Sequence, residues 1–104
     1  MKPPRHITVG PHRYKVVLDR TGALGDSGRS GQCSPSRLTI TIDADQEPSQ
    51  LADSILHEAA GHAPLQSLGL EEEIEERICG ALGSGLLALI RDNPKLIDWM
   101  RGTA

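Results

Sequence analysis

The sequence predicts an α+β fold, with a small, mainly antiparallel sheet packed against two main helices and a short C-terminal helix. Residues 1–43 contain short β-branched runs such as HITVG, HRYKVVLD and RLTITID, which are typical of strands. After the segment QEPSQ, apolar residues recur about every four positions, as they do in amphipathic helices. The chain therefore divides into a strand-forming half and a helical half.

The composition suits a single domain spanning residues 1–104. The chain has no Phe, one Tyr and one Trp, so its core must consist mainly of Leu, Ile, Val and Ala. No apolar run approaches the roughly 20 residues that span a bilayer, and we expect no membrane association. Cys33 and Cys79 form no C-x-x-C pair and follow no signal-like N-terminus, which favours two free thiols in a cytoplasmic protein.

The clearest strand lies in RLTITID, where Leu38, Ile40 and Ile42 fall on one face and polar residues on the other. The preceding segment, RTGALGDSGRSGQCSPS, is rich in Gly and Ser. It predicts a long exposed connection, with short strand pairing near Gln32 and Cys33.

The first predicted helix begins near Pro48, which suits a first turn, with Ser49 as its capping residue. Its buried stripe is predicted to comprise Leu51, Ile55 and Ala59. The second helix opens with the acidic run EEEIEER, which favours the positive end of the helix dipole. Its predicted inward residues are Ile74, Ile78, Leu82, Leu86 and Leu89.

Pro94 ends or restarts the second helix, and PKLIDWM is predicted to form the short C-terminal helix. We expect this helix to dock on the body of the protein through Leu96, Ile97 and Trp99.

Charge is distributed unevenly along the chain. Residues 1–42 hold seven Lys and Arg against two Asp, whereas residues 43–104 hold four against twelve Asp and Glu. A basic segment can bind nucleic acid. Here the basic residues are dispersed among strand residues and only Tyr14 could stack on a base, so we expect a solvated basic face and no nucleic-acid partner.

Residues 57–62, HEAAGH, are the main candidate for chemistry. In the zinc-hydrolase motif H-E-x-x-H, the two histidines lie about 40° apart on a helix and can bind one metal ion. The histidines of HEAAGH are five residues apart, which corresponds to about 140° in a straight α-helix. In that geometry Gly61, and not His62, points in the direction of His57.

Three interpretations of this spacing remain open. A π-bulge, a wide turn with i to i+5 hydrogen bonds, would return His57 and His62 to one face. Gly61 tolerates unusual dihedral angles and Pro64 removes the helical hydrogen bond to Ala60, so both favour such a distortion. Alternatively, the helix ends at Gly61 and His62 reaches a metal from the following turn. In the third interpretation there is no metal site, and His62 lies in the core while His57 lies on the surface.

The order of elements, together with the stretches LTITID, ILHEAAGHA and LIRDNPKLIDWM, resembles the small zincin-type, gluzincin-like metallopeptidase-like proteins of phages and prophages. The resemblance covers most of residues 7–100. It implies a zincin-like fold, a bound Zn²⁺ and hydrolysis of a peptide or protein substrate. Carried over to this chain, His57 and His62 are metal ligands and Glu58 is the catalytic general base. Residues 38–43 would form the sheet edge along which an extended peptide pairs.

The resemblance also implies a third metal ligand, a glutamate from the second helix. Helical-wheel angles place Glu71 and Glu75 nearest the centre of its apolar stripe, Glu72 at the edge, and Glu73 and Glu76 outward. Glu75 is therefore the predicted ligand and Glu72 the next candidate. Cys79 is another possible donor, although a small buried residue is its more ordinary role. A solvated acidic first turn explains the remaining glutamates.

The predicted function is that of a zinc-dependent metallopeptidase-like protein, which hydrolyses peptide bonds with metal-activated water. The alternative is a non-catalytic phage or prophage accessory protein that acts by protein binding, in which the inserted residue has destroyed the metal site. The sequence names neither the substrate nor the oligomeric state.

Overall fold

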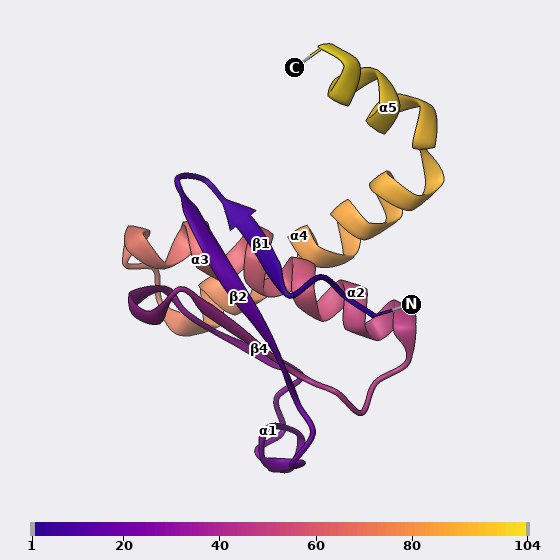
Figure 1. The fold of residues 1–104 in the computed structure, drawn as a ribbon. Helices are drawn as coiled ribbons and strands as arrows, with labels where there is room; N and C mark the ends of the chain where they lie inside the picture. Colours follow the sequence, from indigo (N-terminus) through magenta and orange to yellow (C-terminus); the bar gives the residue numbers. More distant parts are fainter. Residues whose placement is uncertain (1, 104) are drawn as a thin grey trace.

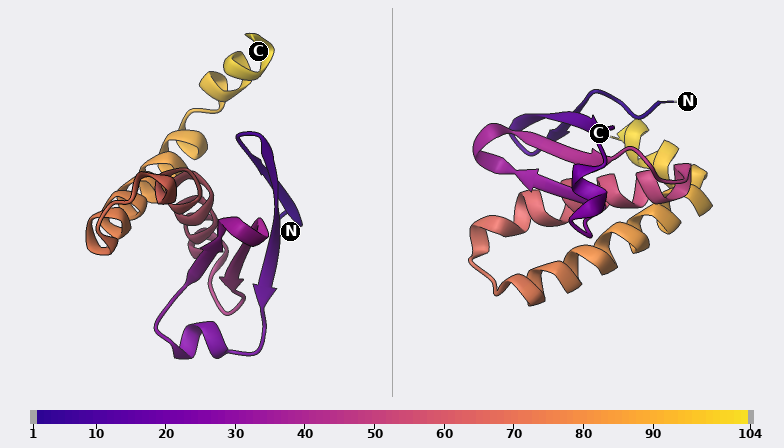
Figure 2. Two further views of the ribbon diagram at one scale, coloured as in Figure 1. Left: turned by 90° about the vertical axis from the view of Figure 1, so that its left-hand side faces the viewer. Right: turned by 90° about the horizontal axis from the view of Figure 1, so that it is seen from below.

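The computed structural model describes residues 2–103, which form an α+β fold with the sheet on one side and the main helices on the other (Figures 1 and 2). The strands are β1 (His6–Val9), β2 (His12–Asp19), β3 (Gly31–Ser34) and β4 (Thr39–Asp43). The helices and helical turns are α1 (Ala23–Asp26), η1 (Pro35–Arg37), α2 (Pro48–Leu56), η2 (His57–His62), α3 (Ala63–Leu65), η3 (Gln66–Leu68), α4 (Glu72–Asp92) and α5 (Pro94–Thr103).

The strands lie in the order β1-β2-β4-β3. β1 pairs with β2 and β3 with β4 in antiparallel fashion, but β2 and β4 are parallel, so the sheet is mixed. The parallel pair is possible because the chain between β2 and β4 is long enough to return to the starting end of the sheet. The expectation that residues 38–43 form a sheet edge is wrong, because β4 pairs on both sides and β3 is the edge strand.

The core lies between the sheet and the helix that carries the histidines. The predicted alternation in β4 is confirmed, since Ile40 and Ile42 are fully buried. They pack with Tyr14 of β2 against Ile55 and Ala59, which belong to the predicted stripe of the first helix. The sheet therefore provides a fixed platform beneath residues 57–62.

The first helix begins with Pro48, as predicted, but Glu47 is its capping residue in place of Ser49. The side chain of Glu47 accepts a hydrogen bond from the backbone of Gln50, and Gln50 Oε1 accepts one from the Glu47 backbone at 3.1 Å. This reciprocal pair satisfies two amide groups at the helix start.

The helix widens into a π-turn at η2, which comprises HEAAGH. The amide of Ala63 donates to the carbonyl of Glu58, five residues earlier. Pro64 follows directly and has no amide hydrogen to donate to Ala60, so the normal α-helical pattern is already interrupted. Of the three interpretations of the histidine spacing, the π-bulge is the one that the structure shows, and the extra residue between the histidines is absorbed within a continuous helix.

The π-turn and α4 approach each other closely through small residues. A Cβ atom on Gly61 would lie 2.6 Å from Cys79 Sγ, and a Cβ on Gly83 would lie 2.9 Å from the backbone nitrogen of His57. Both distances are too short for a real side chain, so only glycine permits this separation. Cys79 and Gly83 are the buried residues of α4.

This packing corrects the predicted inward face of α4. Ile74 is 46% exposed and Leu89 is 47% exposed, and Ile78 is also exposed. Leu82 and Leu86, which the sequence also predicts inward, are half-buried. The buried positions are the small residues Cys79 and Gly83, which bring the two backbones into closer van der Waals contact. The outer side of α4 is therefore partly apolar.

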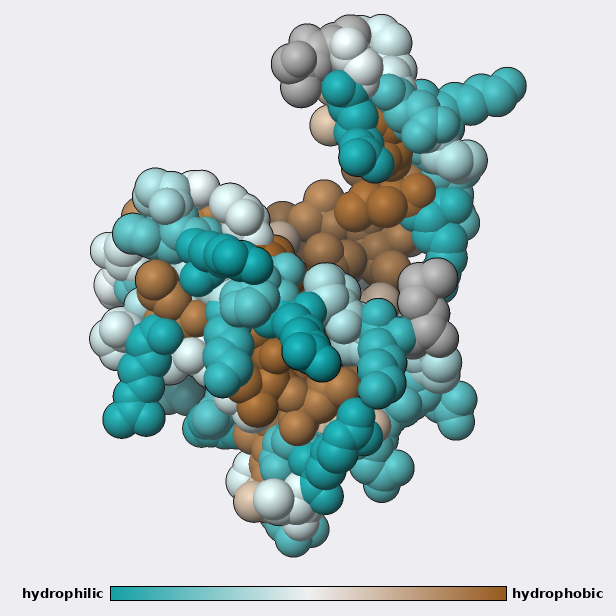
Figure 3. All heavy atoms as spheres, in the orientation of Figure 1, coloured by the Kyte–Doolittle hydropathy of each residue, from teal (hydrophilic) through white to brown (hydrophobic). Residues whose placement is uncertain are grey.

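The expected docking of α5 on the body is also wrong. Figures 1 and 2 show that α5 projects from the end of α4, and Trp99 is 64% exposed. Apolar surface gathers over the C-terminal part of α4 and along α5 (Figure 3). Among residues 2–103, no helix combines the length and apolar character that a membrane span requires.

We expect Gly83→Ala to destabilise the protein by about 1–3 kcal/mol, because the added carbon forces two helical backbones apart. Gly80→Ala is the matched control on the same helix, since nothing lies within 4 Å of its added carbon. The control should stabilise by up to about 1 kcal/mol through its better helix propensity. Urea unfolding followed by circular dichroism measures both changes, and equal stability of the two variants would contradict the packing argument.

Asp19 orders the loop after β2 and gives a pH-dependent prediction. Its carboxylate accepts hydrogen bonds from the Thr21 hydroxyl at 2.6 Å, the Leu24 amide at 2.9 Å and the Thr21 amide at 3.0 Å. The bonds to Thr21 and Leu24 lower the pKa of Asp19. A lowered folded-state pKa contributes stability above the unfolded pKa of about 3.9 that is lost as the pH falls through the folded value.

Asp19→Asn should therefore lower the melting temperature at pH 7, and the difference from the unmodified protein should shrink below about pH 4. Asp26→Asn, in the neighbouring helix α1, should have little effect because no hydrogen bond among the described residues involves the Asp26 carboxylate. A difference for Asp19→Asn that stays constant between pH 7 and pH 3 would argue against an electrostatic contribution.

Candidate metal centre

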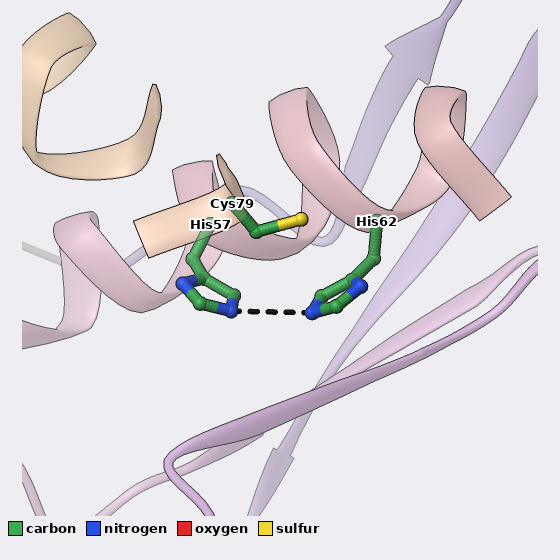
Figure 4. A group of neighbouring side chains, drawn as sticks. All are labelled: His57, His62 and Cys79. Atoms are coloured by element: carbon green, nitrogen blue, oxygen red, sulfur yellow. Dashed lines mark hydrogen bonds between the residues drawn. The ribbon is translucent and has the colours of Figure 1, made fainter. Parts of the chain in front are cut away.

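His57 and His62 lie at the two ends of the π-turn and direct their rings toward each other (Figure 4). Their Nε2 atoms are 3.2 Å apart. Two nitrogen ligands at about 2.0–2.1 Å from a tetrahedral zinc are separated by about 3.3–3.4 Å. The pair of imidazoles therefore has the spacing that a shared metal ion requires.

Glu76 faces both histidines. Its Oε1 lies 2.7 Å from His57 Nε2 and its Oε2 lies 2.8 Å from His62 Nε2. The helical wheel places Glu76 outward, and its side chain is 58% exposed, but its carboxylate reaches both histidines because the buried face of α4 is defined by Cys79 and Gly83. On that corrected face Glu76 points toward the π-turn and becomes a candidate metal ligand.

Glu75, the predicted third ligand, contacts the other side of the His62 ring. Its Oε2 lies 2.6 Å from His62 Nδ1, the nitrogen farther from His57. Burial alone would lower the pKa of His62, but the hydrogen bonds and charges of Glu75, Glu58 and Glu76 outweigh it and raise that pKa. A carboxylate on Nδ1 fixes the orientation of a histidine that binds a metal through Nε2. Glu75 is therefore better placed to orient His62 than to bind the metal itself.

Glu72, the second candidate ligand, is exposed and lines the same cleft. No hydrogen bond or ion pair within residues 2–103 joins it to either histidine.

Cys79 supplies a third type of donor. A nitrogen from each of His57 and His62 and the Cys79 Sγ all lie within 4.8 Å of one another. Figure 4 shows the thiol pointing into the space beside the two rings. Burial, together with the charges of Glu75, Glu76 and Glu58, raises the pKa of the Cys79 thiol to about 11, so the thiol is protonated when no cation is bound.

Glu58 follows His57 directly and is almost completely buried, with 4% of its surface exposed. Its Oε2 lies 3.9 Å from His57 Nε2. A Cβ on Gly31 would lie 3.2 Å from Glu58 Cγ, so the edge strand β3 leaves room for this side chain. Burial raises the pKa of Glu58 to about 7, with His62 and Arg29 opposing and Glu76 and Glu75 reinforcing the increase.

These groups open into a cleft of about 860 Å³ between β3 and the start of α4. One wall carries the segment 28–33, including Arg29 and Cys33, and the other carries the glutamates of α4 and Arg77. Burial, with the nearby acidic groups and Cys79, raises the pKa of Cys33 to about 12, so this thiol is not a reactive thiolate. The cleft is the place where a substrate could reach the histidines and Glu58.

Comparison with models of protein families, with curated proteins and with solved structures gives no match to this chain. The chemistry of the site must therefore be inferred from its own residues.

The sequence contains a signal that could have identified the correct face of α4. Cys79 and Gly83 lie one helical turn apart, and the line through them runs back to Glu72, Glu75 and Glu76. Small residues on a helix allow a neighbouring helix to approach more closely than large residues do. A helical wheel centred on the large residues does not show this face.

We expect Glu75→Ala to weaken zinc binding by about 10–100-fold, because the His62 ring loses the acceptor that fixes its orientation and tautomer. Glu73→Ala is the matched control on the same helix, since Glu73 lines the cleft and has no hydrogen bond or ion pair to a histidine within residues 2–103. Competition with a chromophoric chelator measures the affinities, and nitrogen NMR of the imidazoles reports the tautomer. Equal affinities for the two variants would show that the backbone alone orients His62.

Proposed function

We propose that this protein is a zincin-like, zinc-dependent metallopeptidase of the kind that the resemblance to phage and prophage proteins implies. The observation that supports this proposal most directly is the π-turn. It places two imidazole nitrogens 3.2 Å apart, with the buried carboxylate of Glu58 beside them, in one open cleft. Two histidines, a neighbouring carboxylate and access for a substrate are the elements of metal-assisted hydrolysis.

His57 and His62 would hold the metal through Nε2, and a further donor would come from α4. Glu75 lies on the Nδ1 side of the His62 ring, and with the Nδ1 hydrogen directed to this carboxylate the Nε2 lone pair would be available to a metal. When bound, zinc supplies the Lewis acidity that makes water a nucleophile near neutral pH.

Glu58 is the proposed general base. Its carboxylate accepts a proton from the attacking water and returns it to the nitrogen of the leaving amine. A pKa raised to about 7 suits both steps, because the group can accept and release a proton near neutrality. The charge of His62, and less strongly that of Arg29, opposes this increase in the pKa of Glu58.

The proposed substrate is an extended peptide that pairs with β3. Within the described chain no strand pairs with the outer side of β3, and Gly31, Gln32 and Cys33 of this strand line the cleft. An unpaired strand offers backbone amides and carbonyls to a peptide in the extended conformation. Pairing there would bring a peptide bond toward Glu58 and the histidines.

A non-catalytic protein-binding role is the second candidate. The observation that favours it is the apolar surface of α4 and α5, where Ile90, Leu96 and Trp99 are exposed. Surfaces of this kind often mark protein interfaces.

Two variants separate these functions. His57→Ala should abolish zinc binding, because one of two imidazole donors is lost. Glu58→Gln should keep the zinc and the fold but reduce peptide hydrolysis by about 10²-fold or more, since the general base is removed. Metal analysis by mass spectrometry and cleavage of a peptide library measure these effects, with Glu73→Gln as the matched control.

Failure of the unmodified protein to bind zinc when zinc is offered would reject the metallopeptidase proposal. Zinc binding with equal hydrolysis by the unmodified protein and Glu58→Gln would reject Glu58 as the base. Zinc binding with no cleavage in the library would favour the protein-binding role.

A further inference from the structure

We propose that Cys79 is a fixed metal donor and that Glu76 is a displaceable carboxylate that closes the remaining metal position in the resting protein. This inference rests on the proposed function and concerns the regulation of the same site. It follows from the different ways in which the two side chains are held.

Cys79 is held firmly. It has no exposed surface, and its Sγ and Cβ lie so close to Gly61 that a methyl group there would meet them at 2.6 and 2.7 Å. No side chain in residues 2–103 hydrogen-bonds the thiol, although it points into the space beside the two imidazoles (Figure 4). Thiolate sulfur is a preferred zinc ligand, so this buried and enclosed donor suits a permanent place in the metal shell.

Glu76 is held loosely. Its side chain is 58% exposed, and its only hydrogen bonds and ion pairs within the described chain are those to His57 and His62. The carboxylate can therefore rotate into the cleft without breaking any other hydrogen bond or ion pair among the described residues.

The number of protein ligands at the metal distinguishes a structural zinc site from a catalytic one. His57, His62 and Cys79 form a group of three donors, and Glu76, whose carboxylate contacts both imidazoles, would supply the fourth ligand of a tetrahedral zinc site. Catalytic zinc sites keep three protein ligands and one open position. The resting site is thus closed, and the departure of Glu76 converts it into the open form that hydrolysis needs.

Charge favours the same assignment. Metal binding by Cys79 breaks the S–H bond, releases the proton to solvent and uses the sulfur electron pair for the new bond. A thiolate and a carboxylate then balance a divalent cation. When Glu76 leaves, the metal and its remaining donors carry one net positive charge, so the open form is the better Lewis acid.

Cobalt(II) tests the role of Cys79 without a substrate. The cobalt-loaded protein should show a near-ultraviolet thiolate-to-cobalt charge-transfer band, which Cys79→Ala loses and Cys33→Ala keeps. Cys33 is the matched control because it is the other free cysteine and lines the cleft beside the histidines. If Cys79→Ala does not fold, a sulfur shell at the zinc X-ray absorption edge of the unmodified protein decides the question.

Acetohydroxamate tests the role of Glu76, because this small chelator needs an open metal position. Glu76→Gln should retain cobalt and its charge-transfer band. It should bind acetohydroxamate about tenfold or more tightly than the unmodified protein, in which the open form is a minor population. Glu73→Gln, also an exposed glutamate of the cleft wall, should match the unmodified protein.

Cobalt binding without a charge-transfer band, or loss of the band in Cys33→Ala, would overturn the assignment of Cys79 and leave the proposed function intact. Equal acetohydroxamate affinity in Glu76→Gln and the unmodified protein, or loss of cobalt from Glu76→Gln, would overturn the displaceable role of Glu76. Absence of cobalt binding by the unmodified protein would overturn this inference and the metal site together.

Discussion

The close contact between the π-turn and α4 is the constraint on which the candidate site depends. Gly61 lies against Cys79, and Gly83 lies against the backbone of His57, at separations that exclude any side chain on either glycine. These two contacts fix the rotation of α4 about its axis. Because Glu75 and Glu76 precede Cys79 by one turn, the same rotation brings their carboxylates to the histidines.

The site concentrates charged groups in a way that folding alone does not favour. Glu58, Glu75 and Glu76 surround two imidazoles, and the pKa values of Glu58 and His62 are both raised, so the carboxylates and rings share protons. Clusters of charged groups with shifted pKa values are common at functional sites, where they lower the stability of the fold but serve binding or catalysis. A divalent cation at the imidazole pair would offset the repulsion among the carboxylates.

The rest of the fold presents this centre to the cleft. The buried Ile40 and Ile42 of the sheet support the underside of the π-turn, while β3, at the sheet edge, supplies one wall of the cleft. Gly31 of β3 leaves room for Glu58, so the strand can approach the candidate base closely. The apolar outer side of α4 and the projecting α5 lie outside this arrangement and provide a separate surface.

The sequence by itself determined the features that depend on neighbouring residues. Alternation predicted β4, the change of period predicted the helices, and the spacing of His57 and His62 with Gly61 and Pro64 made the π-turn one of three interpretations. Tertiary structure decided the parallel pairing of β2 and β4, the contact of Glu76 with the two histidines and the projection of α5. A helical wheel gives the angles between residues but not the rotation of the helix, which is set by what the distant partner surface can accommodate. Here the π-turn packs against the small residues Cys79 and Gly83 and leaves the larger Ile74 and Ile78 exposed. This outcome depends on the fit between two distant segments, which the sequence of either segment does not show.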